Sequence, residues 1–175
     1  HHFIKKHGSR RIAFLRGPET HVSAGERYRA FMDALAEENL LTDDYPKLIT
    51  DPFLWTEGED AIIQLHEKRK LVPGHDYDTL FGSSDLMLFS AVRYLQRYGF
   101  RIPQDVRVAA FNDSAESRIL STSFSTVHMP YEELGLASYK KIQEVLANPY
   151  AAVECKSLPA QVVIRESCGC NHILE

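Results

Sequence analysis

Short runs of apolar residues alternate with amphipathic stretches along most of the chain. Arg11–Leu15 (R-I-A-F-L) has the length and composition of a buried strand. The next stretch spaces its apolar side chains so that one helix face carries Ala24, Tyr28, Phe31, Met32 and Leu35. Ser23 and, three residues later, Glu26 form a capping-box pattern that predicts the helix start, and Asn39 is expected to end the helix.

The same alternation continues to residue 164. Further strands are predicted at 47–50, 77–82, 106–111, 124–127 and 161–164. Further helices are predicted at 57–70, from Ser83 or Ser84 to Tyr98, and from Pro130 to about Ala147. Residues 3–7 have the pattern of a helix end, with Gly8 as its stop signal.

Strands that alternate with helices predict a parallel sheet with helices on both faces. The expected fold class is therefore α/β, a doubly wound parallel sheet in three α/β/α layers. Ligands bind such sheets beyond the carboxyl ends of the strands. The candidate segments for binding are those that follow the strands: 16–27, 51–55, 83–85 and 112–113.

Composition narrows the class of protein. The 175 residues are 44% hydrophobic and 25% charged, with a formal net charge of −4, so a basic footprint for nucleic acid is missing. The longest apolar runs are too short to span a membrane, and we expect a cytoplasmic protein. The chain has no P-loop, G-x-S-x-G, H-E-x-x-H or dinucleotide-binding pattern, which disfavours an enzyme and predicts no cofactor.

Three cysteines, Cys155, Cys168 and Cys170, argue against a closed disulfide framework because their number is odd. Cys168 and Cys170 could hold a metal, but a structural zinc site needs four ligands. In the sequence only His172 and Cys155 stand nearby. We therefore predict no metal site.

Several segments, in this order, resemble the effector-binding domain of the LacI/GalR regulators. They are R-I-A-F-L-R-G-P (11–18), S-A-x-x-R (23–27), A-F-x-x-A-L (30–35), S-S-D-L-M (83–87), G-F-R-I-P-Q-D-V-R-V-A-A-F-N-D (99–113), F-S-T-V-H-M-P (124–130), E-L-G (133–135) and L-P-A-Q-V-V-I-R-E-S-C (158–168). The resemblance implies a periplasmic-binding-protein-like domain: two α/β lobes joined by crossing strands, with a small ligand between them.

The resemblance also implies a division into lobes. Residues 9–128 with 158–167 would form most of the C-terminal lobe, and 1–7 with 130–156 would belong to the N-terminal lobe. Residues 168–175 would be a tail or linker, its last residues candidates for a cloning remnant. The chain is expected to be a piece of a longer protein, with the DNA-reading domain upstream.

Roles carry over by position. Arg27 matches a family arginine that clamps ligand hydroxyls or carboxylates, a task that suits a guanidinium fork. The alternative is a surface pairing of Arg27 with Glu26 or Asp33. Phe53 fits an aromatic position after the second strand, and Trp55 beside it would stack on a sugar ring or pack in the core.

Polar candidates follow the third and fourth strands. Ser84 stands where the family usually has asparagine, and Asp85 matches the acidic residue after it, or else caps its own helix. Asn112 stands where many members carry a sugar-binding aspartate, and Asp113 follows it. An amide offers both a donor and an acceptor where a carboxylate only accepts.

The resemblance implies an effector sensor: a small polar ligand, such as a sugar, would favour a closed arrangement of the lobes in a homodimer that binds DNA through its upstream domain. One alternative keeps the sensor but places a diguanylate cyclase or histidine kinase after R-E-S-C-G-C (165–170). Another is an extracytoplasmic solute-binding protein.

Overall fold

The computed structural model describes residues 1–150, 154–155 and 157–170. The expected tail is thus described only to Cys170, part of 130–156 lies outside the described residues, and so does His172. The elements are α1 (His2–His7), β1 (Ile12–Leu15), α2 (Val22–Glu37), η1 (Tyr45–Leu48), α3 (Gly58–Ile63), η2 (Gln64–Lys68), β2 (Thr79–Gly82), α4 (Asp85–Arg97), β3 (Arg107–Ala109), α5 (Ala115–Ile119), β4 (Thr126–His128), α6 (Tyr131–Ala147), β5 (Gln161–Val163) and η3 (Glu166–Cys168).

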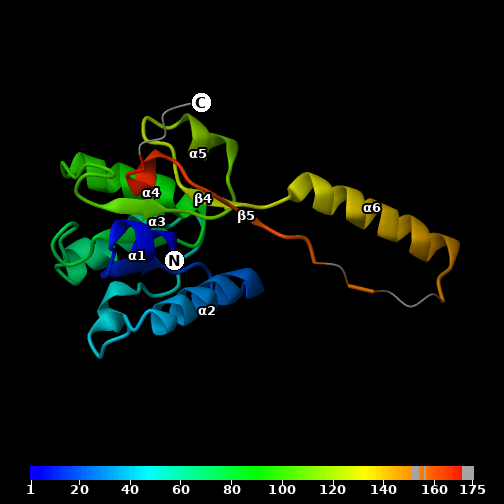
Figure 1. The fold of residues 1–175 in the computed structure, drawn as a ribbon, viewed down its shortest axis with the longest axis horizontal. Coiled ribbons are helices and arrows are strands. Elements are labelled where there is room, and N and C mark those ends of the chain that lie inside the picture. Colours follow the sequence, from blue (N-terminus) through cyan, green and yellow to red (C-terminus); the bar gives the residue numbers. More distant parts are fainter. Residues whose placement is uncertain (151–153, 156, 171–175) are drawn as a thin grey trace.

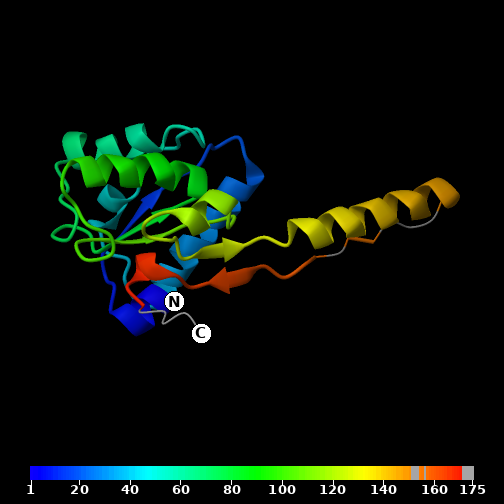
Figure 2. The same cartoon turned by 90° about the horizontal axis from the view of Figure 1, so that it is seen from above.

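The central sheet is parallel, in the order β1-β2-β3. Single parallel bridges extend it on both sides, from Phe14 to Ile49 and from Ala109 to Ser125. Because parallel crossovers are right-handed, a strand order that reverses direction places successive helices on opposite faces. Figure 2 shows α3 and α4 together on one face of the sheet and α2 on the other. The predicted doubly wound three-layer fold is confirmed.

Helix α2 packs its predicted apolar face on the sheet. Ala24 and Leu35 are buried, and the larger side chains between them pack against the core. The predicted end is confirmed: Asn39 has a φ of 56°, and Leu40 N–H donates to the Leu35 carbonyl in a Schellman arrangement. The predicted capping box is wrong, because α2 begins at Val22 and no side chain caps its first turn.

The predicted strand at 47–50 is also wrong. Residues 45–48 form the 3-10 helix η1, which Pro46 at its start favours. Only Ile49 bridges the sheet, and Thr50 N–H donates to the Phe14 carbonyl. One bridged residue replaces a strand because the segment enters the sheet at its outer edge.

Helices α3, η2 and α4 cover the opposite face. The predicted helix 57–70 is divided into the α-helix α3 and the π-helical turn η2, and its inward residues Ala61, Ile62 and Leu65 are fully buried. Helix α4 begins as predicted after Ser84, whose Oγ accepts a hydrogen bond from Met87 N–H. Gly99, with a φ of 85°, follows its end.

Helix α6 projects away from this body (Figure 1). The chain reaches it from β4, and β5 pairs with β4 antiparallel on the return. This pair departs from the all-parallel expectation because it crosses out of the sheet. No residue of α6 is buried, and its exposed apolar side chains are Leu134, Leu136, Ile142 and Leu146, with Tyr131 and Tyr139.

The N-terminal helix α1 packs on the main body. Ile4 is buried in the same core as β1 and β2. The packing therefore joins α1 to the body that holds the sheet, whereas the sequence-based division separated residues 1–7 from it. Across the described part of the chain, no helix combines the length and apolarity that crossing a membrane requires.

Candidate functional site

The segments that follow β1, β2 and β3 meet at one edge of the sheet. Ser83 connects the first two, because its N–H donates to the Leu15 carbonyl at 3.1 Å and its Oγ accepts from Gly17 N–H at 3.1 Å. The segment after β3 is joined to the segment after β2, because Asp85 N–H donates to the Phe111 carbonyl at 2.9 Å. The strand ends thus converge as the parallel sheet predicts.

Arg27 reaches from α2 across these strand ends. Its Nη1 donates to the Ser83 carbonyl at 2.7 Å, and its Nη2 donates to Asn112 Oδ1 at 3.2 Å. The guanidinium carbon lies 3.8 Å from the centroid of the Phe111 ring. Burial lowers the pKa of Arg27 below its ordinary value, and Tyr131 and Asp85 act in the opposite direction. A planar cation is therefore held on an aromatic face with its edge toward two acceptors.

Trp55 is a second aromatic neighbour of Arg27, with its ring centroid 5.8 Å from the guanidinium carbon. The ring lies against Gly17, where a Cβ atom would collide with it. His21 meets the same ring edge-on at 5.7 Å. Phe53 and Trp55 both pack against the core, but only Trp55 also contacts Arg27. Of the two aromatic candidates, Trp55 is the one that the structure brings to Arg27.

Asn112 is held in an unusual backbone conformation, with a φ of 116°. Its Oδ1 accepts from Arg27 and also from the Tyr131 hydroxyl at 3.2 Å. Sequence reasoning missed Tyr131 and Phe111 as neighbours of this group. The signals were weak: Phe111 is the last residue of a predicted strand, and Tyr131 follows the Pro130 helix start.

Ser84 and Asp85 hold the fold together at this edge. The Ser84 hydroxyl caps α4, and its residue is almost fully buried. The buried Asp85 carboxylate accepts from Ser114 N–H and from the Thr126 hydroxyl. Burial raises the pKa of Asp85, while these hydrogen bonds lower it. Both side chains make internal hydrogen bonds that fix the loops around Arg27.

The Asp113 carboxylate is engaged by two arginines and a histidine. Its side chain is 3% exposed and accepts from Arg165 at 2.6 Å, Arg118 at 2.7 Å and His128 at 2.9 Å. Of the seven residues predicted for the site, the structure thus gathers Arg27, Trp55 and Asn112. The other four make internal contacts: Phe53 packs against the core, and Ser84, Asp85 and Asp113 accept hydrogen bonds from other parts of the chain.

A cavity of about 220 Å³ lies behind this group, between α1, α2 and the sheet. Arg27 and Phe111 form part of its wall, and most of the remaining lining is apolar. A polar ligand fits such a lining poorly, because few of its groups would find hydrogen-bond partners there. The candidate polar site is therefore the strand-end group of Arg27, Trp55 and Asn112.

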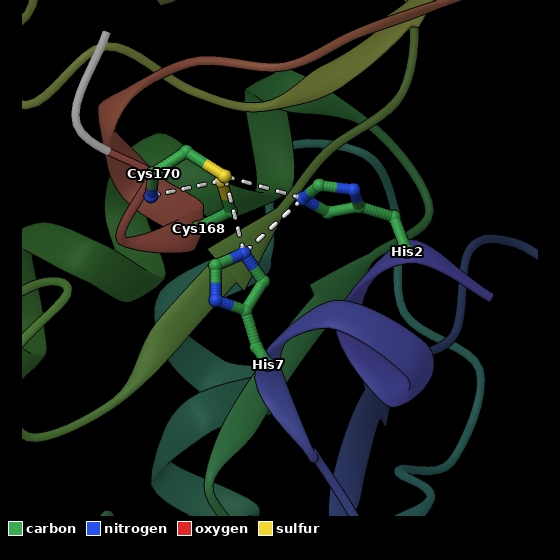
Figure 3. A group of neighbouring side chains, drawn as sticks. All are labelled: His2, His7, Cys168 and Cys170. Carbon is green, nitrogen blue, oxygen red and sulfur yellow. Dashed lines mark hydrogen bonds between the residues drawn. The ribbon is translucent and has the colours of Figure 1, made fainter.

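The prediction of no metal site considered only the ligands near Cys168 and Cys170 in the sequence. The structure brings these two cysteines to His2 and His7, at the opposite end of the chain (Figure 3). Distance along the sequence concealed this group, since only the packing of α1 beside η3 creates it. It lies apart from the strand-end group.

Comparison with known proteins gives a consistent result. Residues 1–168 match the model of the periplasmic binding protein-like domain. The transcriptional regulator CelR of Thermobifida fusca is 28% identical over 91% of this chain and 45% of its own length, and the repressor MelR of Bacillus subtilis is 32% identical over 59% and 30%. The solved complex of CelR with cellobiose has a TM-score of 0.81 at 27% identity and covers 94% of this chain and 48% of that one.

The chain spans about half the length, or less, of the relatives that it matches. The fold, the order of the motifs and the match over residues 1–168 agree. The relatives that it matches are transcriptional regulators, and the chain itself belongs to the family of periplasmic binding protein-like domains.

Proposed function

We propose that this chain is the effector-binding part of a transcriptional regulator, with the ligand held at the strand ends. One observation carries the proposal: the Arg27 guanidinium lies on the Phe111 ring and joins the loops after β2 and β3 through Ser83 and Asn112. A ligand that hydrogen-bonds to Arg27 or Asn112 senses the relative position of both loops. This is a binding role and requires no catalytic group.

The ligand class follows from the groups present. Arg27 offers charged donors, Asn112 offers a donor and an acceptor, and Trp55 offers an aromatic face of the kind that stacks on sugar rings. The related CelR was solved with cellobiose. We infer a small hydroxylated ligand, a sugar or a similar polar metabolite.

The second wall of the site would come from the other lobe. We assign residues 9–128 and 158–167 to the lobe that carries Arg27, and 130–156 to the other lobe. The exposed apolar side chains of α6 support this assignment, because they offer a surface on which the rest of the other lobe would pack. Because Ile4 is buried in the core of the first lobe, we place residues 1–7 there as well. Tyr131, at the start of α6, contacts Asn112 and so connects the lobes at the site.

Signalling would follow from differential affinity. A ligand that binds the closed arrangement more tightly than the open one shifts the equilibrium between them. In a homodimer this changes how the upstream DNA-binding domains are presented, with a coupling free energy of about 1–3 kcal/mol. The relatives named above are regulators, which favours this output over a cyclase or kinase.

The test is a thermal-shift screen of the full-length protein with cellobiose, other disaccharides, pentoses, nucleosides and amino-acid derivatives. A true effector at a hundred times its Kd stabilises the protein by about 2.7 kcal/mol. Arg27→Ala should then weaken binding by about 1–3 kcal/mol, roughly 5- to 150-fold, in titration calorimetry. Arg29→Ala, an exposed arginine of the same helix, is the matched control.

Equal affinity of the Arg27→Ala variant and the wild type would exclude Arg27 from the site. Binding that requires neither Arg27 nor Asn112 would move the ligand elsewhere and overturn the proposal.

A further inference from the structure

Four side chains with metal-binding atoms converge at one point on the surface of the main body. His2 and His7 come from α1, Cys168 ends η3, and Cys170 lies two residues later (Figure 3). Their imidazole nitrogens and sulfurs all lie within 4.8 Å of one another. Up to 168 residues of sequence separate the two pairs, so tertiary packing alone assembles this group.

The spacing matches a tetrahedral metal site. With Zn–N of about 2.05 Å and Zn–S of about 2.3 Å, a regular tetrahedron separates two nitrogens by about 3.3 Å and a nitrogen from a sulfur by about 3.5 Å. In the structure His2 Nε2 and His7 Nε2 are 3.2 Å apart. Cys170 Sγ lies 3.6 Å from the first and 3.3 Å from the second. Three of the four ligand atoms thus already have the separations that zinc requires.

Both backbone segments that carry the ligands are anchored. Ile4 fixes α1 in the core, and Gly8 ends the helix directly after His7 with a φ of 67°. On the other side, Ser167 Oγ donates to the Val108 carbonyl and accepts from Ser125 N–H, which ties η3 to β3 and to the residue before β4. The ligands therefore sit on a rigid frame, which reduces the conformational entropy that binding a metal would cost.

The turn at Gly169 completes the arrangement. Its φ of 84° lies in the left-handed region, which glycine enters without strain. This turn returns Cys170 N–H toward Cys168 Sγ at 3.4 Å. A backbone N–H that donates to a sulfur stabilises the thiolate form, in the way that surrounding hydrogen bonds commonly support metal ligands.

The Cys168 thiol donates to the Arg165 carbonyl at 3.1 Å. A metal that binds here displaces the thiol protons, as is usual for cysteine ligands.

We propose that His2, His7, Cys168 and Cys170 form a structural zinc site that joins α1 to the segment after β5. Two thiolates and two imidazoles in a tetrahedron are the ligand set that selects zinc among the common divalent ions. All four positions are filled by protein atoms, so the site holds the fold together and leaves no position for a substrate. The partial exposure of His2, His7 and Cys170 gives the ion a way in.

The experiment uses the reduced chain, purified with a tag that contains no histidine and removed before measurement. Zinc per chain is measured by elemental analysis after dialysis, and affinity by competition with a chromophoric chelator. We expect one zinc per chain. Cobalt substituted for zinc should give thiolate-to-cobalt charge-transfer absorption and the intense visible bands of a tetrahedral ion.

Variants assign the ligands. Cys170→Ser and His7→Gln should each weaken zinc binding by about a hundredfold or more, since changes even to residues behind the ligands weaken metal sites 10- to 100-fold. Cys155→Ser and His75→Gln, which change an exposed cysteine and an exposed histidine outside the group, should bind zinc as the wild type does.

Three outcomes overturn the proposal: no zinc retained by the reduced chain, a cobalt spectrum without thiolate absorption, or unchanged affinity in both ligand variants. The cobalt spectrum is recorded on the wild type, so the test does not depend on whether a variant folds.

Discussion

The Asp113 carboxylate accepts a hydrogen bond of 2.6 Å from Arg165, a residue 52 positions later in the chain. Asp113 follows β3, and Arg165 follows β5 on the return from α6. The second carboxylate oxygen takes Arg118 and His128, and His128 is the last residue of β4. One buried anion thus fastens the end of the central sheet to both strands that cross out of it.

Asp113→Asn should destabilise the domain by about 3 kcal/mol. Removing one partner of a buried ion pair leaves the other charge uncompensated, and here two arginines and a histidine lose the same anion. Urea unfolding followed by circular dichroism measures the change. Glu144→Gln, which breaks the exposed pair with Lys141 on α6, should leave the midpoint nearly unchanged. Equal effects of the two substitutions would contradict the assigned role.

The same carboxylate predicts a loss of stability in acid. Burial raises the pKa of Asp113. Hydrogen bonds from Arg165 and Arg118 and the charge of Arg165 lower it by more than burial raises it, so the pKa of Asp113 lies below its ordinary value of 3.8. The stabilisation is complete above the unfolded value and is lost as the pH falls through the lowered folded value.

The measurement is the difference in unfolding free energy between wild type and Asp113→Asn as a function of pH. This difference should shrink below about pH 4, because protonation of Asp113 removes from the wild type the same carboxylate charge that the substitution removes from the variant. A difference that stays constant down to pH 2 would contradict the lowered pKa.

Ser84→Ala should reduce stability by about 1 kcal/mol, because it removes the side-chain cap of α4 at Met87 N–H. Ser23→Ala is the matched control, since Ser23 is exposed in the first turn of α2 and no side chain caps that helix. Thermal unfolding of both variants checks the pair. Because the Ser84 hydroxyl is engaged in the cap, effector affinity measured by calorimetry should be little changed.

Trp55 is the only tryptophan of the chain, so intrinsic fluorescence reports on the candidate site. Gly17→Ala should displace the indole from its seat, since the new Cβ would occupy the position of the ring. We expect a changed emission spectrum without ligand, and a change in wild-type emission when effector binds near Arg27. Gly25→Ala, at an open position on α2, should leave the emission unchanged. If Gly17→Ala keeps the wild-type spectrum, the indole does not rest on Gly17.

Most elements were predictable from periodicity. The buried strands β1, β2 and β3 and the apolar faces of α2 and α4 follow patterns that the sequence displays locally. Two predictions were wrong because a neighbouring residue favoured another local structure. Pro46 favours a 3-10 turn over the strand expected at 47–50, and His21 takes the helix-start position expected for Ser23. The antiparallel β4–β5 pair was hidden because a three-residue strand does not reveal its partner.

The site was predictable in position but only partly in membership. Arg27, Trp55 and Asn112 follow from motif and strand end, but Asp85 and Asp113 have the same sequence signature and make internal hydrogen bonds instead. Which way a carboxylate points depends on neighbours such as Thr126 and Arg165, which come from distant segments.

The amino-acid order by itself determined the alternation of strands and helices, the α/β class and the edge where strand ends collect, because these depend on side chains a few residues apart. Tertiary structure decided which polar groups meet. His2 finds Cys170, and Asp113 finds Arg165, only after the chain has folded back on itself. The physical reason is that a hydrogen bond or a metal bond acts over about 2–3.5 Å in space, whereas a sequence pattern reports only distance along the backbone.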